Sequence, residues 1–216
     1  MTPRGYSSPV RDEAAAHTRR RIVAAATRLL RARGAAGFSL EAVARKANVT
    51  RLTVYNQFGS RRALLEAVFD DRAAQGGLSR LGEAVAMEPP QAALARVVEI
   101  FCDFWSFDHG AVTGLQRVGG MDAEFQAALA ARNARRRGLI GHLAARLADV
   151  SPAAAENLTH QLFALTSFAF FAELATPQGT EAASRQVQHL AQLAIAVTEK
   201  PAPAALRKRK AGLEPP

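Results

Sequence analysis

The chain has 216 residues and a formal net charge of +9, with 28 Lys and Arg against 19 Asp and Glu. Apolar residues make up 49% of the chain, which is enough for a packed core and excludes wholesale disorder. The single cysteine, Cys102, excludes an intramolecular disulfide. The N-terminus lacks a signal-like apolar run, and the most apolar segment, residues 162–175, is shorter than the roughly 20 residues of a bilayer span. We therefore expect a soluble cytoplasmic protein with no membrane partner.

The positive charge is concentrated at the two ends of the chain. Residues 1–75 hold 14 Lys and Arg against 6 Asp and Glu, whereas residues 76–199 hold 9 against 12. Residues 200–216 hold 5 against 1. A basic front part and a mildly acidic middle predict a segment that binds a polyanion, attached to a body with another task.

The front part is predicted to be helical, because apolar residues recur at three- and four-residue spacing and strand-like alternation is absent. Thr18, Ser39 and Ser60 are typical helix caps, and Asn48 suits a turn that needs a left-handed residue. The expected elements, in chain order, are a mobile arm over residues 1–17 and helices over residues 18–33, 39–47 and 50–58, then a fourth helix from residue 60 to about 75.

The remainder of the chain is also predicted to be helical, as a body over residues 76–199 that follows a DNA-binding domain over residues 18–75. The expected elements are helices over residues 90–107, 111–118, 122–148 and 152–174, a turn over residues 176–179, and a last helix over residues 181–199. Residues 200–216 combine proline with charge and are expected to be a disordered basic tail.

The segment from Phe38 to Phe58 has the pattern of two short helices joined by a turn, which is the helix-turn-helix arrangement. Val54 and Phe58 are expected to face the core, so that the opposite face carries an almost uncharged group of side chains. Such a face fits the major groove of DNA: an arginine can bind guanine, an asparagine can bind adenine, and methyl groups can contact thymine. The residues expected to contact bases are Arg51, Leu52, Thr53 and Asn56.

Residues on either side of this face are expected to contact phosphates. Hydroxyl groups of Thr50 and Tyr55 can reach the DNA backbone, and the start of a helix at Ser60 and Arg61 favours an anion. The complete set of candidate DNA-binding residues is Arg19, Ser39, Thr50, Arg51, Leu52, Thr53, Tyr55, Asn56, Ser60 and Arg61.

Half of the 14 aromatic residues gather in two segments, residues 101–107 and 168–171. They are either plain core or the lining of a ligand pocket, because pockets in helical bundles have the same apolar character. The candidate ligand-binding residues are Phe101, Phe104, Trp105, His109, Phe168 and Phe171. The arginine run at residues 135–137 is interpreted as a solvated face, with contact to a partner or ligand as the alternative.

No catalytic residue, cofactor or metal is predicted. The five histidines show neither metal-ligand spacing nor an adjacent cysteine, and nucleophile–base pairs and phosphate-binding glycine loops are missing. An enzyme of helical fold is therefore disfavoured against a DNA-binding protein.

Roughly 50 residues of the front part resemble the DNA-binding domain of the tetracycline-repressor (TetR) family of bacterial regulators. The resemblance lies in four groups of residues: Ile22, Ala25 and Ala26; Gly37-Phe38-Ser39; Tyr55 and Phe58; and Ser60-Arg61. Asn48 replaces the usual turn glycine, and Leu52 replaces a usual small residue or proline. The second departure implies an unusual base preference.

The resemblance implies an all-helical homodimer that binds a palindromic operator on double-stranded DNA. By family habit it implies a repressor, with a small-molecule effector that binds the C-terminal domain and releases the operator. The alternative is a regulator without an effector, constitutive or controlled by a partner. The resemblance also implies a dimer interface built from the last two helices, through Leu158, Leu162, Leu165 and Phe168 and through Val187, Leu190, Leu193, Ala194 and Val197.

Overall fold

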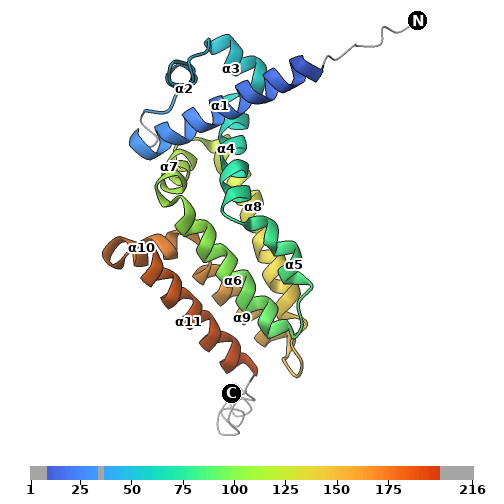
Figure 1. Ribbon diagram of the computed structural model, residues 1–216. Helices are drawn as coiled ribbons and strands as arrows, with labels where there is room; N and C mark the ends of the chain where they lie inside the picture. Colours follow the sequence, from blue (N-terminus) through green and yellow to red (C-terminus); the bar gives the residue numbers. More distant parts are fainter. Residues whose placement is uncertain (1–8, 34–36, 200–216) are drawn as a thin grey trace, which may run out of the picture. The chain divides into compact units, whose positions relative to one another are not determined.

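The computed structural model describes residues 9–33 and 37–199, and every regular element in that part of the chain is a helix, as predicted (Figure 1). The α-helices are α1 (Pro9–Arg33), α2 (Leu40–Ala47), α3 (Arg51–Phe58), α4 (Arg61–Gln75), α5 (Leu81–Val85), α6 (Pro90–Phe107), α7 (His109–Gly119), α8 (Ala123–Ala144), α9 (Pro152–Leu165), α10 (Phe168–Gln178) and α11 (Thr180–Glu199), with a 3-10 turn η1 (Leu78–Arg80) before α5. The short elements η1 and α5 were not predicted. Among the described residues, no helix is long and apolar enough to cross a membrane.

The chain divides into two compact units. Unit 1 contains the residues up to 79 together with residues 103–134, and unit 2 contains residues 80–102 and the residues from 135 on. Helices α6 and α8 therefore contribute residues to both units. The expected DNA-binding domain, residues 18–75, lies within unit 1, and a functional boundary after residue 75 stays a prediction.

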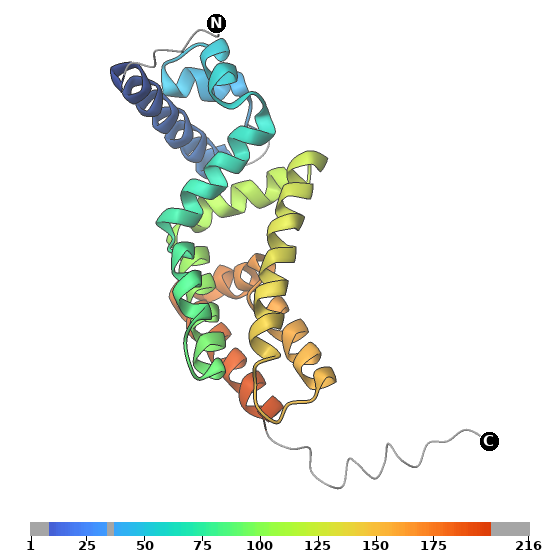
Figure 2. The same cartoon turned by 90° about the vertical axis from the view of Figure 1, so that its right-hand side faces the viewer.

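Unit 1 is organised around α1, against which α2, α4 and α7 pack (Figure 2). Ile22, Ala26 and Leu30 are buried on α1, as the helical periodicity predicts. Helix α7 crosses α1 closely at Gly114, where an added Cβ would lie 2.7 Å from the carbonyl oxygen of Leu30. Only glycine allows the two helices to approach to this distance.

Helix α1 begins at Pro9, nine residues before the predicted cap at Thr18. Residues 9–17 of the expected arm are therefore part of α1, their mobility stays a prediction, and residues 1–8 lie outside the described residues. Proline is tolerated in the first turn of a helix, and Asp12 in that turn complements the helix dipole. A run of three alanines, residues 14–16, then continues the helix with the best helix-forming residue.

The helices that follow in unit 1 also begin or end at other residues than predicted. Helix α7 begins at His109 because Asp108 caps it, with its carboxylate accepting a hydrogen bond from the Ala111 amide at 3.3 Å. Helix α8, which continues into unit 2, ends at Ala144 rather than at residue 148.

In unit 2, the predicted single helix over residues 152–174 is two helices, α9 and α10. Ser167 has an extended backbone and its hydroxyl accepts a hydrogen bond from the Phe170 amide at 3.2 Å, so it caps a new helix. The predicted turn at residues 176–179 is also wrong, because α10 continues through Pro177 to Gln178. Gly179, with φ 84°, then ends the helix.

Helix α11 packs against α9 and α10 and also lies beside the first part of α6. Its buried side is a row at four-residue spacing: Ala183, Val187, Ala191 and Ile195. Gln91 near the start of α6 bonds to Glu199 at the end of α11, whereas Cys102 contacts the Ser184 carbonyl near its start. These contacts show that α6 and α11 run antiparallel within unit 2 (Figure 1).

Candidate DNA interface

The predicted helix-turn-helix is present as α2, a short turn and α3, and its geometry is fixed by side-chain caps. The Ser39 hydroxyl accepts from the Ala42 amide at 3.1 Å, and the Thr50 hydroxyl accepts from the Thr53 amide at 3.0 Å. Asn48 adopts the left-handed conformation, φ 51° and ψ 52°, that the turn requires. Each helix therefore begins at a fixed residue, and α3 is held at a defined angle to α2.

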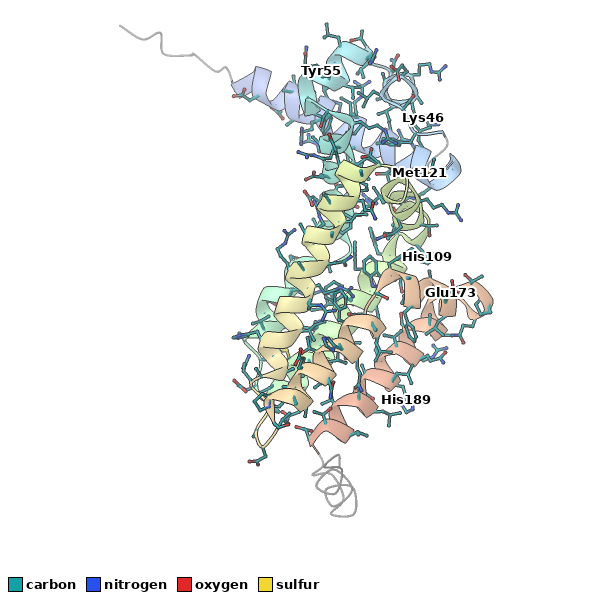
Figure 3. The ribbon with its side chains drawn as sticks, turned by 180° about the vertical axis from the view of Figure 1, so that it is seen from behind. Lys46, Tyr55, His109, Met121, Glu173 and His189 are labelled. Carbon is teal, nitrogen blue, oxygen red and sulfur yellow. The ribbon has the colours of Figure 1, made fainter. Side chains whose placement is uncertain are left out.

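Helix α3 has one buried and one exposed face, as predicted. Val54 and Phe58 are buried against the rest of unit 1. Leu52 and Tyr55 are 65% and 56% exposed, and Asn56 is also exposed. Tyr55 is labelled in Figure 3. Leu52 and Tyr55 lie one turn apart on α3, so their side chains share this face instead of being scattered singly. The exposed face has the composition expected of a surface that binds base edges.

Arg51 lies at the edge of this face and pairs with Glu41 of α2, with 2.9 Å between Nε and Oε1. The pKa of Glu41 lies below its usual value, first because the Glu41 carboxylate accepts a hydrogen bond from the Glu41 backbone amide, and in addition because Arg51 is positively charged. Both side chains are more than half exposed, so the pair contributes little to stability. The arginine is thus positioned but remains accessible to a ligand.

Two arginines of α1 hold the ends of the motif. Arg19 donates to the Gln57 carbonyl at 2.6 Å and stacks on Phe58, 4.2 Å from the ring centroid. Arg21 donates to the Ala47 carbonyl at 2.7 Å. Cations at the carbonyl ends of α2 and α3 satisfy backbone acceptors and complement the helix dipoles. The sequence predicted Arg19 as a DNA-binding residue, in contact with a phosphate or with a minor groove, and it did not identify this bracing contact or that of Arg21.

At the start of α4, the two candidate phosphate ligands, Ser60 and Arg61, make different contacts. Ser60 is exposed and caps the helix by accepting from the Ala63 amide at 3.0 Å. Arg61 pairs with Asp122, which precedes α8, and lies 5.5 Å from the ring centroid of Phe38. Arg61 therefore ties α4 to α8 within unit 1, in addition to any contact it makes with DNA.

An ion-pair cluster joins three helices of unit 1 and was not found from the sequence. Asp108 accepts two hydrogen bonds from Arg31 of α1, at 2.7 and 2.6 Å, and one from Arg72 of α4 at 3.0 Å. Burial raises the pKa of Asp108, but the hydrogen bonds from both arginines and from the Ala111 amide outweigh it, so the pKa lies below its ordinary value. The three residues are 36 or more positions apart in the sequence, and no local pattern connects them.

The six candidate ligand-binding residues do not all belong to one unit. Phe104, Trp105 and His109 belong to unit 1, and Phe101, Phe168 and Phe171 belong to unit 2. Within unit 1, the rings of Phe104 and Trp105 contact each other at 4.5 Å between centroids. Of the six, Phe101, Phe104, Trp105 and Phe171 are buried, and the other two are partly exposed. Their role as core or as a ligand pocket stays open.

Arg136 is the exception in the predicted solvated run at residues 135–137. It is 7% exposed, lies 4.2 Å from the ring centroid of Phe163 and donates to the Thr166 hydroxyl at 2.8 Å. Burial, and to a smaller extent the charge of Arg137, lowers the pKa of Arg136 to about 10. Within the described residues, no group of three or more His, Cys, Asp or Glu side chains could hold a metal ion.

Residues 22–68, which include α2 and α3, match the family described as bacterial regulatory proteins, tetR family. Three solved structures have a similar fold. A TetR-like transcriptional regulator from Rhodococcus sp. RHA1 is 21% identical, with a TM-score of 0.61 over 91% of this chain and 99% of that one. NalD from Pseudomonas aeruginosa, the secondary repressor of the MexAB-OprM multidrug efflux pump, is 23% identical, with a TM-score of 0.66 over 85% and 96%. The multidrug binding protein EbrR, complexed with imidazole, is 25% identical, with a TM-score of 0.55 over 94% and 100%. No curated protein matches the sequence.

Proposed function

We propose that this chain, a DNA-binding transcriptional regulator of the TetR family, is a repressor that binds a palindromic operator as a homodimer and leaves it when a small apolar ligand binds. The observation that carries the DNA-binding part is the exposed, nearly uncharged face of α3. Leu52, Tyr55 and Asn56 occupy that face, while caps and the bracing Arg19 fix the helix that presents them. Preorganised side chains lose little entropy when they bind, which favours specific recognition.

The homodimer is supported by an apolar strip on α11. Leu193 and Val197 lie one turn apart and are 49% and 70% exposed, and Leu190 and Ala194 beside them are partly exposed. The strip is narrower than the set expected from the sequence, because Leu158, Leu162 and Val187 are buried inside the chain. A self-complementary strip of this kind fits a two-fold interface, and a two-fold dimer matches half-sites spaced by whole turns of about 10 base pairs.

The ligand is supported by the aromatic content of the candidate residues and by the relatives. NalD is a repressor of an efflux pump and EbrR is a multidrug binding protein, so proteins of this fold include a repressor and a protein that binds small molecules. An apolar aromatic lining suits a small hydrophobic compound. Linkage between two binding sites is reciprocal. A compound that weakens operator binding must therefore itself bind less tightly to the protein when the operator is bound.

The test begins with selection of bound fragments from random duplex DNA by the full chain. Fluorescence anisotropy then measures affinity for the selected duplex at physiological ionic strength, with and without a panel of hydrophobic compounds. Trp105 is the single tryptophan, so its emission reports ligand binding without a label. We expect a palindromic consensus and at least one compound that both changes Trp105 emission and lowers DNA affinity.

Each part of the proposal has its own contradicting result. Equal affinity for all duplexes would overturn the DNA-reading role of α3. A consensus with a single asymmetric half-site would overturn the dimer. If operator binding is specific but no compound changes it, the chain is a regulator without a small-molecule effector.

A further inference from the structure

Most of the described arginine side chains of unit 1 are engaged by groups of the protein itself. Their partners are backbone carbonyls at the ends of α2 and α3, or carboxylates of the same or of neighbouring segments. The engaged arginines are Arg19, Arg21, Arg31, Arg51, Arg61, Arg62, Arg72 and Arg132. The large positive charge of the front part is therefore only partly available to DNA. The cations that remain available are those outside this engaged set.

A groove of about 530 Å³ between α1 and α2 is lined by three cationic side chains outside the engaged set. Arg28 lines it from α1, and Arg45 and Lys46 line it from the last turn of α2. All three side chains are exposed, and Leu29, Ala32 and Ala42 complete the lining. No carboxylate is among the residues described along this groove, so three like charges face a common space.

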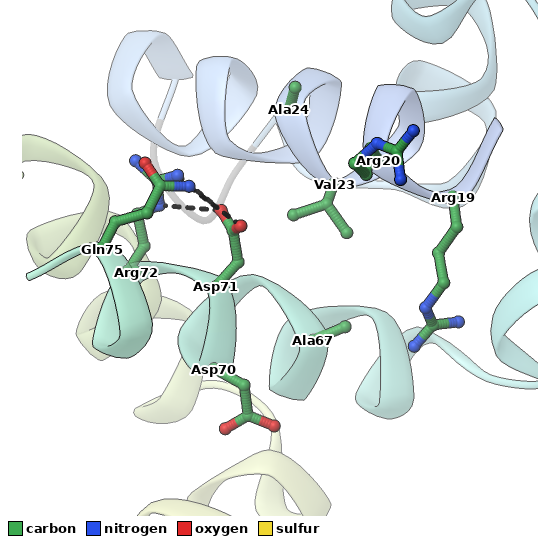
Figure 4. A pocket seen from close by; sticks show the side chains of 9 residues that line it. All are labelled: Arg19, Arg20, Val23, Ala24, Ala67, Asp70, Asp71, Arg72 and Gln75. Carbon is green, nitrogen blue, oxygen red and sulfur yellow. Dashed lines mark hydrogen bonds and ion pairs between the residues drawn. The ribbon is translucent and has the colours of Figure 1, made fainter. Parts of the chain in front are cut away.

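A second groove of the same unit shows that this arrangement is not general. The groove between α1 and α4, of about 490 Å³, is lined by Arg19, Arg20 and Arg72 but also by Asp70 and Asp71 (Figure 4). There the Asp71 carboxylate accepts hydrogen bonds from the Arg72 guanidinium at 2.5 Å and from the side-chain amide of Gln75 at 3.0 Å. In that groove a lining carboxylate pairs with a lining arginine. Among the described residues no carboxylate lines the groove between α1 and α2, where Glu41 interacts with Arg45 alone among the three cations, so an external anion there would reduce their repulsion.

The α1–α2 groove lies on a different side of α2 from α3. Glu41 reaches the α3 side, where it pairs with Arg51. Ala42 and Lys46 lie one turn apart on the α1 side, and Tyr55 of α3 is separate from Lys46 in Figure 3. An anion in the groove therefore leaves the exposed face of α3 free.

We propose that the groove between α1 and α2 binds phosphodiester groups of DNA outside the base pairs that α3 contacts. The proposal rests on the proposed DNA-binding function and extends it to a second surface. A duplex carries one negative charge per about 1.7 Å of helix axis, so a row of cations beside an apolar floor binds it by releasing counterions. This contact adds affinity without adding sequence preference.

The test measures how DNA affinity depends on salt. The full chain is titrated by fluorescence anisotropy with two probes: a selected duplex trimmed to its footprint, and the same duplex extended by about 10 base pairs at each end. Each is measured at several salt concentrations for wild type, for the double variant Arg28→Ala/Lys46→Ala, and for Arg117→Ala. Arg45 is kept, because its charge acts on Glu41 and thus on Arg51. Arg117 is an exposed cation of unit 1 outside the groove and serves as the matched control.

We expect the wild type to show a steeper dependence of log K on log salt with the extended duplex than with the trimmed one. The double variant loses about 2 units of that slope on the extended duplex, about 0.9 for each phosphate contact. It binds the trimmed duplex as the wild type does, and Arg117→Ala matches the wild type on both. Circular dichroism checks that the double variant is folded, as its exposed positions predict.

Equal slopes for wild type and double variant on the extended duplex, with specific binding of the trimmed duplex intact, would overturn the groove proposal and leave the proposed function standing. Loss of specific binding by the wild type itself would instead concern α3. Inorganic triphosphate is titrated as a separate probe. If the double variant loses triphosphate binding while its salt slope is unchanged, the groove takes a free phosphate compound, and the proposal of a DNA contact is wrong.

Discussion

Arg72 of α4 and Asp108 before α7 form an ion pair in which both side chains are at least nine-tenths buried, with 3.0 Å between Nη1 and Oδ2. Arg31 of α1, whose side chain is half exposed, pairs with the same carboxylate, with 2.6 Å between Nη2 and Oδ2. Asp108 also caps α7. One carboxylate thus fixes α1, α4 and α7 to one another, and α1 and α4 are the helices that precede and follow the helix-turn-helix in the chain.

Asp108→Asn is expected to destabilise the protein by about 2–3 kcal/mol, because it removes the buried carboxylate that pairs with Arg72 and leaves this guanidinium only the more exposed Asp71. Asparagine is itself a good cap, so the effect reports the charge rather than the start of α7. Urea unfolding followed by circular dichroism measures the change. Arg31→Gln is the control: its side chain is half exposed, and we expect a loss of about 1 kcal/mol or less. Equal losses in the two variants would contradict the central role of the buried pair.

The same carboxylate predicts a dependence of stability on pH. The pKa of Asp108 is lower in the folded chain than its ordinary value, which is about 4. Its contribution is therefore complete above that value and is lost as the pH falls through the lower folded pKa. The difference in unfolding free energy between wild type and Asp108→Asn should be constant from pH 7 to 5 and shrink below about pH 4. A difference that stays unchanged at pH 3 would show that the carboxylate does not act through its charge.

Two glycines of α7 are expected to respond to alanine with opposite signs. At Gly114 the new Cβ would lie 2.7 Å from a backbone oxygen of α1, so Gly114→Ala must push the helices apart, at a cost of about 1–3 kcal/mol. At Gly110 the nearest atom is the Arg31 Cγ at 3.7 Å, and alanine gains up to about 1 kcal/mol of helix propensity. Thermal unfolding should show a lower Tm for the first variant and an equal or higher Tm for the second. A rise in both would contradict the close crossing of α1 and α7.

The features that the sequence predicted correctly depend on neighbours along the chain. Ser39 and Ser60 cap helices because a hydroxyl bonds to an amide three residues on, and Val54 and Phe58 share a face because they are one turn apart. Both signals are local. The exposed face of α3 follows from the same periodicity, so the candidate DNA surface could be predicted without the fold.

The features that the sequence missed depend on long-range contacts or on competition between signals. Arg72 and Asp108 are far apart in the chain, so nothing local marks them as a pair. Ser167 lies in an apolar segment whose helical spacing continues on both sides, and its capping tendency was outweighed in the prediction. Arg136 is buried because it stacks on Phe163, which only the packing of α8 and α9 reveals.

The apolar strip on α11 predicts the oligomeric state. Leu193→Asp combined with Val197→Asp places two charges in the proposed interface and should convert the dimer to a monomer. Sedimentation equilibrium measures the mass, and Met121→Asp is the control, because Met121 is 76% exposed and belongs to unit 1, whereas α11 belongs to unit 2. We also expect weaker binding to the two-half-site duplex in the double variant only. A double variant that remains a dimer would show that α11 does not form the interface.

Arg51 and Tyr55 are expected to affect DNA binding in different ways. Arg51→Ala should cost about 1–3 kcal/mol on the selected duplex and relax the preference at one base position, because we propose that the guanidinium binds a base edge. Tyr55→Phe removes the hydroxyl that we expect to contact a phosphate and should weaken binding to all duplexes alike. Selection from random DNA, repeated with each variant, measures both effects.

Glu41→Gln separates base recognition by Arg51 from its ion pair. If Arg51 acts only through the 2.9 Å contact with Glu41, this variant should reproduce the effect of Arg51→Ala. If Arg51 binds a base, Glu41→Gln should keep the base preference and bind DNA at least as tightly, since it removes a negative charge near the phosphates. An unchanged base preference in Arg51→Ala would mean that α3 enters the groove in another orientation, with Asn56 rather than Arg51 at its centre.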